Sequence, residues 1–327
     1  MRKRIDFFLY AQYNKNMDVI SLAKNYKTLA IVGICKNAGK TTALNLLLRQ
    51  KGLAVTSIGR DGETTDVVTN TPKPRIFVTA GTLVATAYSL LVNCTVTREI
   101  LCATGISCPL GEIVIFKCLD DGFVDLAGPS ISAQLILLKQ KFFELGAQKI
   151  LIDGALERKS FSCAKIADAV LLAVGASYDK NINKVIAETD FTLKLYSLPQ
   201  ATFDAPPSQN VTEDAQKGKT QIFTEGALSE STLKQLCLLK NANQLTVAVS
   251  DASKILASPK TVNAFLAKGA KLQTKNIVKV IAVTVNPYSA YGWQFDKDDF
   301  KHAIQQITKL PVLNALEDCF MSNDKKK

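Results

Sequence analysis

Residues 33–42 combine two glycines, two lysines and two threonines in an order that could hold a polyphosphate. Gly33 opens the stretch, and Gly39 is followed directly by Lys40, Thr41 and Thr42. Backbone N–H groups of such a loop, with the positive end of a following helix, attract phosphate oxygens. A lysine placed here reaches the terminal phosphates, and the next hydroxyl ligates Mg²⁺. The residues predicted to bind a nucleoside triphosphate are Asn37, Ala38, Gly39, Lys40, Thr41 and Thr42.

The flanking residues fit a phosphate-binding loop (P-loop). Residues 29–32 form an apolar run that predicts a buried strand, and residues 43–48 predict a helix that begins at once. Five residues separate Gly33 from Gly39, where the usual spacing is four, so the loop is one residue longer. The alternative is a strand, turn and helix that binds no phosphate.

Two aspartates could complete this site. Asp153 follows the apolar run 149–152, and Asp61 lies in the loop 59–66 after a second predicted strand, 54–58. Ligands of open α/β sheets bind at the carboxyl ends of strands, where a carboxylate can hold the Mg²⁺ water shell or orient an attacking group. The predicted catalytic residues are Lys40, Asp153 and Asp61, and the predicted metal site consists of Thr41, Asp153 and Asp61. Helix capping is the alternative role for Asp153.

Alternating apolar and amphipathic runs predict the elements that position these residues. Strands are expected at 76–78 and 169–174, a helix at 83–91, and a helical or mixed segment at 187–195. Asp120-Asp121-Gly122 predicts a hairpin between 112–119 and 123–127. A helix capped by Ser130 or Ser132 should end at Gly146. The expected fold is α/β, a P-loop NTPase with a largely parallel, doubly wound sheet, an inserted hairpin and a carboxyl-terminal α/β extension.

Composition divides the chain into four parts. A basic arm, 1–27, precedes the predicted P-loop nucleotide-binding domain, 28–200. Residues 201–220 are rich in Pro, Gln, Asn, Asp and Lys and predict a linker. Residues 221–327 resume the alternation as a carboxyl-terminal α/β domain or sheet extension, with a tryptophan-containing loop, 286–293, that is either a partner or ligand surface or a packed turn.

Overall composition limits the possible partners. The net charge is +11, but the lysines and arginines are scattered and no basic stripe is interleaved with aromatics, which makes nucleic acid an unlikely partner. The uncharged stretch 76–97 contains threonines, Ser89 and Asn93, so a strand and a helix explain it better than a membrane span. We therefore expect a soluble protein.

Cysteine and histidine usage points to a reducing compartment. Eight cysteines form no C-x-x-C pair, and His302 is the sole histidine. This argues against a zinc site and favours reduced thiols in a cytoplasmic protein. A redox pair of Cys102 and Cys108 is the alternative.

The motifs resemble those of the dethiobiotin synthetase and cobyrinic acid amide synthase branch of P-loop proteins. The similarity covers about residues 28–195 and includes the longer glycine spacing, Asp153-Gly154-Ala155 and Val174-Gly175-Ala176. It implies that Lys40 and Thr41 bind phosphate and Mg²⁺ and that Asp153 assists the metal. The synthetases have a substrate-handling Lys-Pro element after the second strand. Here Gly59-Arg60-Asp61-Gly62 stands instead, which argues against carboxylation or amidation chemistry.

Over its whole length the chain is similar to the small P-loop subunits of lysine 5,6-aminomutase reactivating factors. The stretches concerned are 33–42, 59–63, 128–130, 153–160 and 285–289. This resemblance implies an ATPase that acts with a larger partner subunit on a cobalamin-dependent mutase. The expected function is Mg²⁺-dependent ATP binding and hydrolysis coupled to a partner protein. An ATP-dependent ligase that activates a small carboxylic acid and a nucleotide-binding protein with little turnover are the alternatives.

Overall fold

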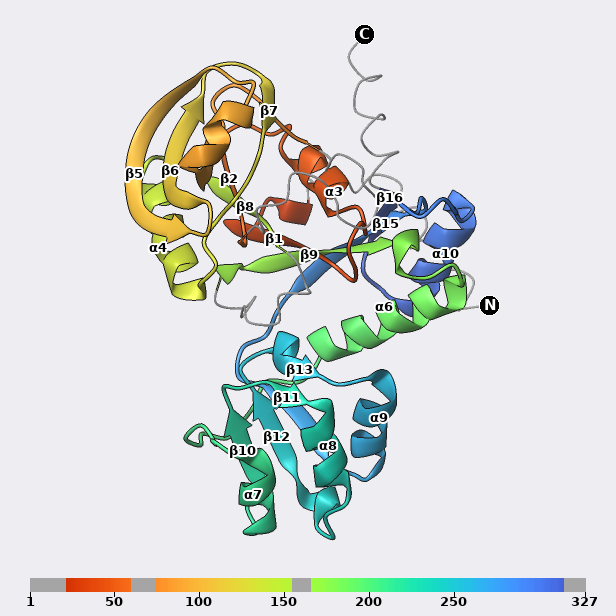
Figure 1. Ribbon diagram of the computed structural model, residues 1–327. Helices are drawn as coiled ribbons and strands as arrows, with labels where there is room; N and C mark the ends of the chain where they lie inside the picture. The colour runs from red at the N-terminus through yellow and green to blue at the C-terminus, as the bar shows by residue number, and fades with distance from the viewer. Residues whose placement is uncertain (1–21, 60–74, 155–165, 315–327) are drawn as a thin grey trace.

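The computed structural model describes residues 22–59, 75–154 and 166–314 (Figure 1). In these residues a large, mostly parallel central sheet carries helices on both faces, with a smaller α/β unit beside it. The α/β class predicted from the sequence is therefore confirmed.

Within the described residues, nine strands form the central sheet. They are β1 (Thr28–Gly33), β2 (Leu53–Ser57), β4 (Leu83–Ala87), β5 (Arg98–Cys108), β6 (Gly111–Cys118), β8 (Lys149–Asp153), β9 (Ala169–Gly175), β15 (Val280–Asn286) and β16 (Val312–Asn314). Their order is β16-β15-β9-β1-β8-β2-β4-β6-β5. Neighbours from β16 to β4 run parallel, whereas β6 is antiparallel to both β4 and β5. The predicted strand 29–32 is thus β1, paired on both edges.

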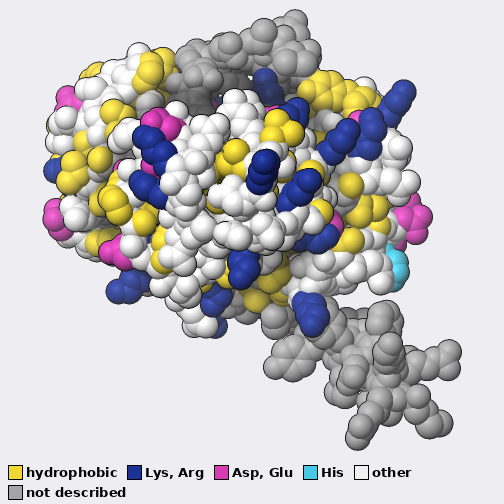
Figure 2. All heavy atoms as spheres, turned by 90° about the horizontal axis from the view of Figure 1, so that it is seen from below, with side chains coloured by type: hydrophobic (Ala, Val, Ile, Leu, Met, Phe, Trp, Pro, Cys, Tyr) yellow, Lys and Arg dark blue, Asp and Glu magenta, His cyan; other side chains and the backbone are white. Residues whose placement is uncertain are grey.

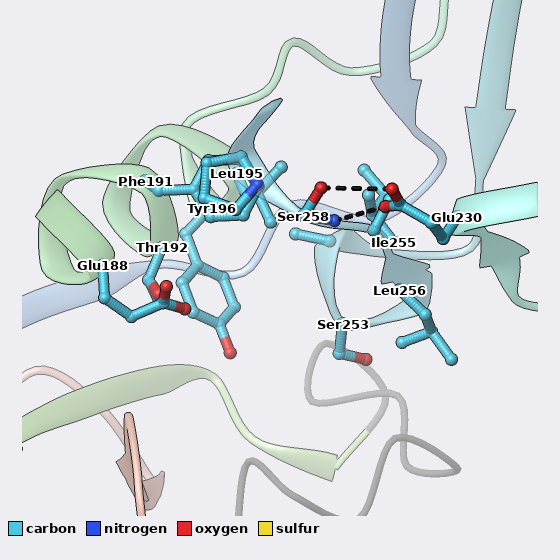
Figure 3. A pocket seen from close by; sticks show the side chains of 13 residues that line it. Glu188, Phe191, Thr192, Leu195, Tyr196, Glu230, Ser253, Ile255, Leu256 and Ser258 are labelled. Atoms are coloured by element: carbon cyan, nitrogen blue, oxygen red, sulfur yellow. Dashed lines mark hydrogen bonds between the residues drawn. The ribbon is translucent and has the colours of Figure 1, made fainter. Parts of the chain in front are cut away.

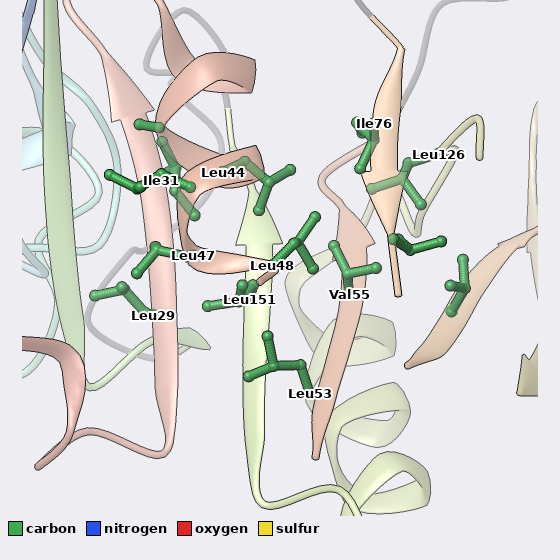
Figure 4. Packing of buried hydrophobic residues seen from close by; sticks show 14 of the residues in the cluster. Leu29, Ile31, Leu44, Leu47, Leu48, Leu53, Val55, Ile76, Leu126 and Leu151 are labelled. Atoms are coloured by element: carbon green, nitrogen blue, oxygen red, sulfur yellow. The ribbon is translucent and has the colours of Figure 1, made fainter. Parts of the chain in front are cut away.

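Alternate side chains of β1 enter two different cores. Leu29 and Ile31 pack with Leu44 of helix α3 (Lys40–Leu47), as Figure 4 shows. Ala30 points to the opposite face and shares a core with Leu138 of α4 (Ser132–Glu144). Full burial of one such leucine contributes about 1.5–3 kcal/mol. β1, which precedes the glycine loop, is therefore packed on both faces of the sheet, and α3, which follows the loop, is packed against one of them.

Two further helices cover the face that carries α4. These are α6 (Ile182–Tyr196) and α10 (Lys297–Ile307). Val170 of β9 packs in the core beneath α4, while Leu172, two residues on, packs with Val185 of α6 and Phe300 of α10. Residues two apart on a strand share a face, so α4, α6 and α10 lie on one side and α3 on the other.

Residues 199–276 form a separate, smaller α/β arrangement, here named the small unit (Figure 1). Its parallel sheet consists of β10 (Gln221–Thr224), β12 (Thr246–Val249) and β14 (Lys271–Thr274). A short parallel pair is formed by β11 (Leu228–Ser229) and β13 (Ile255–Leu256). Its helices are α7 (Val211–Gln216), α8 (Glu230–Cys237) and α9 (Pro259–Ala267). These elements bury a core of their own.

The carboxyl-terminal half differs from its expected organisation. The proposed linker 201–220 includes α7, whose first turn is capped because Asn210 Oδ1 accepts the Glu213 N–H at 3.2 Å. Residues 221–314 contribute strands to three sheets, since β15 and β16 return to the central sheet. The small unit is thus inserted between α6 and β15.

The helix predicted over 83–91 is wrong. Residues 83–87 are β4, followed by the 3-10 helix η1 (Tyr88–Asn93). All five residues of β4 are buried, because the sheet is covered on both faces at this position. Such a strand lacks the polar alternation that would distinguish it from a buried helix.

The predicted hairpin has a different partner. β6 pairs with β5, and β7 (Gly122–Val124) pairs antiparallel with β3 (Ile76–Val78) in a separate two-stranded sheet. The Asp120 carboxylate accepts the Thr97 N–H at 2.7 Å, and Asp121 accepts the Ala80 N–H at 2.8 Å. These acids therefore join distant loops and do not form the turn of a hairpin.

For the helix predicted to run from Ser130 or Ser132 to Gly146, the predicted end is correct and the predicted cap is wrong. α4 begins after Ile131 without a side-chain cap, so neither Ser130 nor Ser132 has the predicted role. Gly146, by contrast, does end the helix in the left-handed region, at φ 89°.

Candidate functional site

The loop from Gly33 to Gly39 lies at the carboxyl end of β1 and leads directly into α3. Asn37 has φ 60° and Gly39 has φ 96°, so the chain turns through two left-handed positions before the helix. The first N–H groups of a helix have no intrahelical acceptor, and no side chain caps those of α3. The loop therefore presents donors at the positive end of a helix, as an anion site requires.

Lys40, the first residue of α3, folds back over the loop. A Cβ on Gly33 would lie 3.0 Å from Lys40 Cγ and 3.1 Å from Nζ. The ammonium donates to the Cys35 carbonyl at 3.4 Å, a long and weak hydrogen bond. A residue larger than glycine at position 33 would displace this side chain, which explains why the loop opens with Gly33.

Two neighbouring strand ends contact the loop directly. A Cβ on Gly175, at the end of β9, would lie 2.6 Å from Ala38 Cα. A Cβ on Gly39 would lie 2.9 Å from Cβ of Asn286, at the end of β15. The position of the loop therefore depends on the ends of β9 and β15.

Asp153 lies on the other side of β1. It is the last residue of β8 and is in register with Ile31, and the Gly154 N–H donates to the Ile31 carbonyl at 3.0 Å. Its Oδ1 atom is buried and makes no hydrogen bond within the described residues. Burial raises the pKa of the Asp153 carboxyl, and the positive charge of Lys40 opposes that rise. A buried carboxyl with an unpartnered oxygen suits a cation or a donor that arrives with a ligand.

The remaining candidate residues divide into two groups. Thr41 and Thr42 lie half-buried in the first turn of α3, next to Lys40. Asp61 lies outside the described residues, as do all residues of its loop except Gly59. The described ranges contain no cluster of three His, Cys, Asp or Glu side chains that could hold a metal. Mg²⁺ needs only a few ligands from the protein, because it usually keeps several bound waters.

Sequence reasoning missed the role of Gly128. A Cβ there would lie 1.7 Å from the Ser57 carbonyl oxygen, and the Gly128 N–H donates to Ser57 Oγ at 3.0 Å. The Gly59 N–H in turn donates to the Pro129 carbonyl at 2.9 Å. The end of β2, from which the Asp61 loop departs, is thus fixed by a backbone approach that only glycine permits. The Gly-Pro pair was the available signal.

The tryptophan loop is a packed turn beside this site. Trp293 Nε1 donates to the Ala176 carbonyl at 2.9 Å, and the Ala290 N–H donates to Ser177 Oγ at 3.0 Å. The Tyr291 ring stacks on Trp293 with centroids 5.5 Å apart. These contacts attach the loop after β15 to η2 (Ala176–Tyr178), which directly follows Gly175.

The surface gives no single basic stripe on the face that Figure 2 shows. Lysine and arginine side chains there are spread among uncharged and apolar ones. No helix in the described ranges is both long enough and apolar enough to cross a membrane.

Comparisons with known proteins identify no relative, so the candidate site is described by its geometry alone. No protein-family model, no curated protein and no solved structure matches the chain.

Proposed function

We propose that this protein binds a nucleoside triphosphate with Mg²⁺ at the Gly33–Gly39 loop, hydrolyses it, and uses the change of nucleotide state to act on a partner protein. The observation on which this proposal depends is the Asp153 carboxyl. Its Oδ1 atom is buried beside β1 and has no partner among the described residues, and the carboxyl is close enough to Lys40 for that charge to influence its pKa.

The described residues fit such a ligand in two respects. The uncapped first turn of α3 and the Lys40 ammonium supply donors and positive charge for phosphate oxygens. Asp153 and the Thr41 hydroxyl supply oxygen atoms for a hard cation. The ligand, when bound, provides the transferable phosphoryl group and the metal charge that balances it.

Each residue then has a distinct task. Lys40 exchanges its weak bond to the Cys35 carbonyl for the terminal phosphates. Thr41 holds the cation from α3, while Asp153 holds it, or a water bound to it, from β8. A cation beside Asp153 favours the ionised carboxylate, which burial alone disfavours.

Contacts of the loop offer a path for coupling. Ala38 touches Gly175, and Gly39 touches Asn286, so a shift of the loop displaces the ends of β9 and β15. η2 follows Gly175 and leads toward α6, which contacts the small unit. On the sequence resemblance alone, the proposed partners are a larger subunit and a cobalamin-dependent aminomutase.

The test compares four variants in ATP binding and hydrolysis. Lys40→Ala should abolish binding of a fluorescent ATP analogue, whereas Lys51→Ala, an exposed lysine after α3, should not change it. Asp153→Asn should keep binding and lower Mg²⁺-dependent hydrolysis by about 10²-fold. Asp190→Asn, a half-buried carboxylate paired with Lys194, is its matched control.

The outcomes separate the alternatives. Unchanged ATP affinity in Lys40→Ala would refute the nucleotide site, and full hydrolysis in Asp153→Asn would remove that residue from it. Addition of a purified cobalamin-dependent aminomutase should stimulate hydrolysis. ATP consumption that requires a small carboxylic acid would instead support a ligase.

A further inference from the structure

A cavity of about 390 Å³ lies between α6 and the small unit, away from the Gly33–Gly39 loop (Figure 3). One side consists of α6 residues, and the other consists of the start of α8, β13 and the start of α9. α6 contributes Glu188, Phe191, Thr192, Leu195 and Tyr196 to the lining. Its volume is in the range typical of small-molecule sites.

The charges of the cavity are opposite to those of the whole chain. Among the described residues, Glu188 and Glu230 are its charged lining residues and no lysine or arginine lines it, although the protein has a net charge of +11. A carboxylate, phosphate or sulfate ligand would find no cationic side chain among the lining residues and would meet two anions. The lining therefore disfavours acidic ligands.

Of the two carboxylates that line the cavity, Glu230 has a structural role. It accepts the Ser258 N–H at 2.7 Å and the Ser258 hydroxyl at 3.2 Å, it also bonds Thr261, and Lys234 pairs with it at 3.1 Å. These bonds lower the pKa of Glu230 to about 2, with the Thr261 hydroxyl the largest cause. Glu230 thus joins the starts of α8 and α9 and keeps one wall negatively charged.

Glu188 has bonding capacity left. Its Oε2 accepts the Tyr178 hydroxyl at 3.0 Å, and within the described residues no partner is recorded for Oε1. Figure 3 shows the side chain extending from α6 beside Thr192 and Tyr196, at the rim of the cavity. A carboxylate accepts several hydrogen bonds, so Oε1 can receive a donor from a ligand without loss of the tyrosine bond.

Apolar side chains cover the rest of the lining. Phe191 and Leu195 of α6 face Ile255 and Leu256 across the cavity in Figure 3. Such surfaces favour an aromatic or aliphatic body of a few carbon atoms, and they leave the carboxylate as the polar anchor.

We infer that this cavity binds a small organic amine, with its ammonium group paired to Glu188 and its apolar body between α6 and β13. The site goes beyond the proposed nucleotide function and does not depend on it, because none of its lining residues belongs to the Gly33–Gly39 loop.

The experiment uses three probes of nearly equal size that differ in charge. Phenethylamine, 2-phenylethanol and 3-phenylpropionate are titrated into the full-length protein without nucleotide, and binding is followed by saturation-transfer NMR. Phenethylamine should bind at least about tenfold more tightly than the alcohol, because an ammonium–carboxylate hydrogen bond is stronger than a neutral one. The acid should bind more weakly than either.

Variants locate the binding. Glu188→Gln keeps an acceptor for Tyr178 but loses the charge, and should weaken phenethylamine binding about tenfold. Asp190→Asn makes the same charge change two residues away on α6, outside the cavity, and should have no effect. Ala257→Leu should reduce binding by filling the cavity. The inference would be overturned by equal binding of the three probes, by the absence of saturation transfer to all of them, or by unchanged phenethylamine affinity in Glu188→Gln. The comparison of the three probes uses only the parent protein, so it does not depend on the folding of a variant.

Discussion

Gly175→Ala tests whether the end of β9 positions the glycine loop. Gly175 has φ −134° and ψ 149°, an extended conformation open to any residue, so an added methyl acts only through the space that it occupies. That methyl would lie 2.6 Å from Ala38 Cα and 3.0 Å from the Ala38 carbonyl carbon and oxygen. All three are backbone atoms, which cannot rotate away as a side chain would.

The size of the effect follows from these distances. Ordinary contact begins at 3.4 Å, so Ala38 must move away by about 0.8 Å. Insertion of a methyl group into a packed site costs about 1–3 kcal/mol of unfolding free energy. A misplacement of about 1 Å can reduce a geometry-dependent activity by about 10²-fold. We therefore expect Gly175→Ala to weaken ATP binding about tenfold or more and to lower hydrolysis further.

The assay combines urea unfolding with titration of a fluorescent ATP analogue. Gly226→Ala is the matched control, because its new Cβ would meet only Thr224 Oγ1 at 3.4 Å. The control should retain parental affinity and stability. If Gly175→Ala also bound ATP and unfolded like the parent protein, contact between β9 and the loop would not position the site.

Three further outcomes test packing, hydrogen bonding and charge. Leu44→Ala should cost about 2–5 kcal/mol of unfolding free energy in urea, because Leu44 is fully buried, whereas Leu238→Ala, 84% exposed, should change it by less than about 0.5 kcal/mol. Trp293→Phe removes the bond to the Ala176 carbonyl and should cost about 1 kcal/mol by the same measurement; no change would show that the bond contributes nothing. The pKa of Glu230 is about 2 against an ordinary 4.5, so the ionised carboxylate stabilises the fold above pH 4.5 and this contribution is lost as pH falls through 2. The difference in Tm between the parent and Glu230→Gln should therefore shrink from pH 6 to pH 2, and a constant difference would contradict this assignment.

The sequence predicts the centre of the sheet better than its edges. β1, β8 and β9 are buried apolar runs that end in small or acidic residues, and such runs are visible locally. The sequence predicts a helix at β4 because complete burial removes the alternation that would mark a strand. The return of β15 to β9 depends on contacts between distant segments that no local pattern contains.

The candidate site shows the same division. Lys40 and Asp153 could be named from the sequence, because each directly follows a predicted strand or loop. Their relation depends on the pairing of β1 with β8, which the order of segments does not specify. The close approach of Gly128 to Ser57 could not be inferred, because it joins residues 71 positions apart. The structure has no bearing on Asp61, which lies outside the described residues.

The inserted position of the small unit has a consequence for how the chain can be divided. Its first and last segments lie side by side: the Thr274 N–H donates to the Pro199 carbonyl at 3.0 Å, and the Ala201 N–H donates to the Thr274 carbonyl at 2.8 Å. A short turn from Leu198 to Ile277 would therefore bypass the whole insertion while leaving the flanking α6 and β15 in place. The protein is modular in the genetic sense, because one internal deletion would separate the central sheet and α3, which begins at Lys40, from the unit that completes the proposed amine cavity.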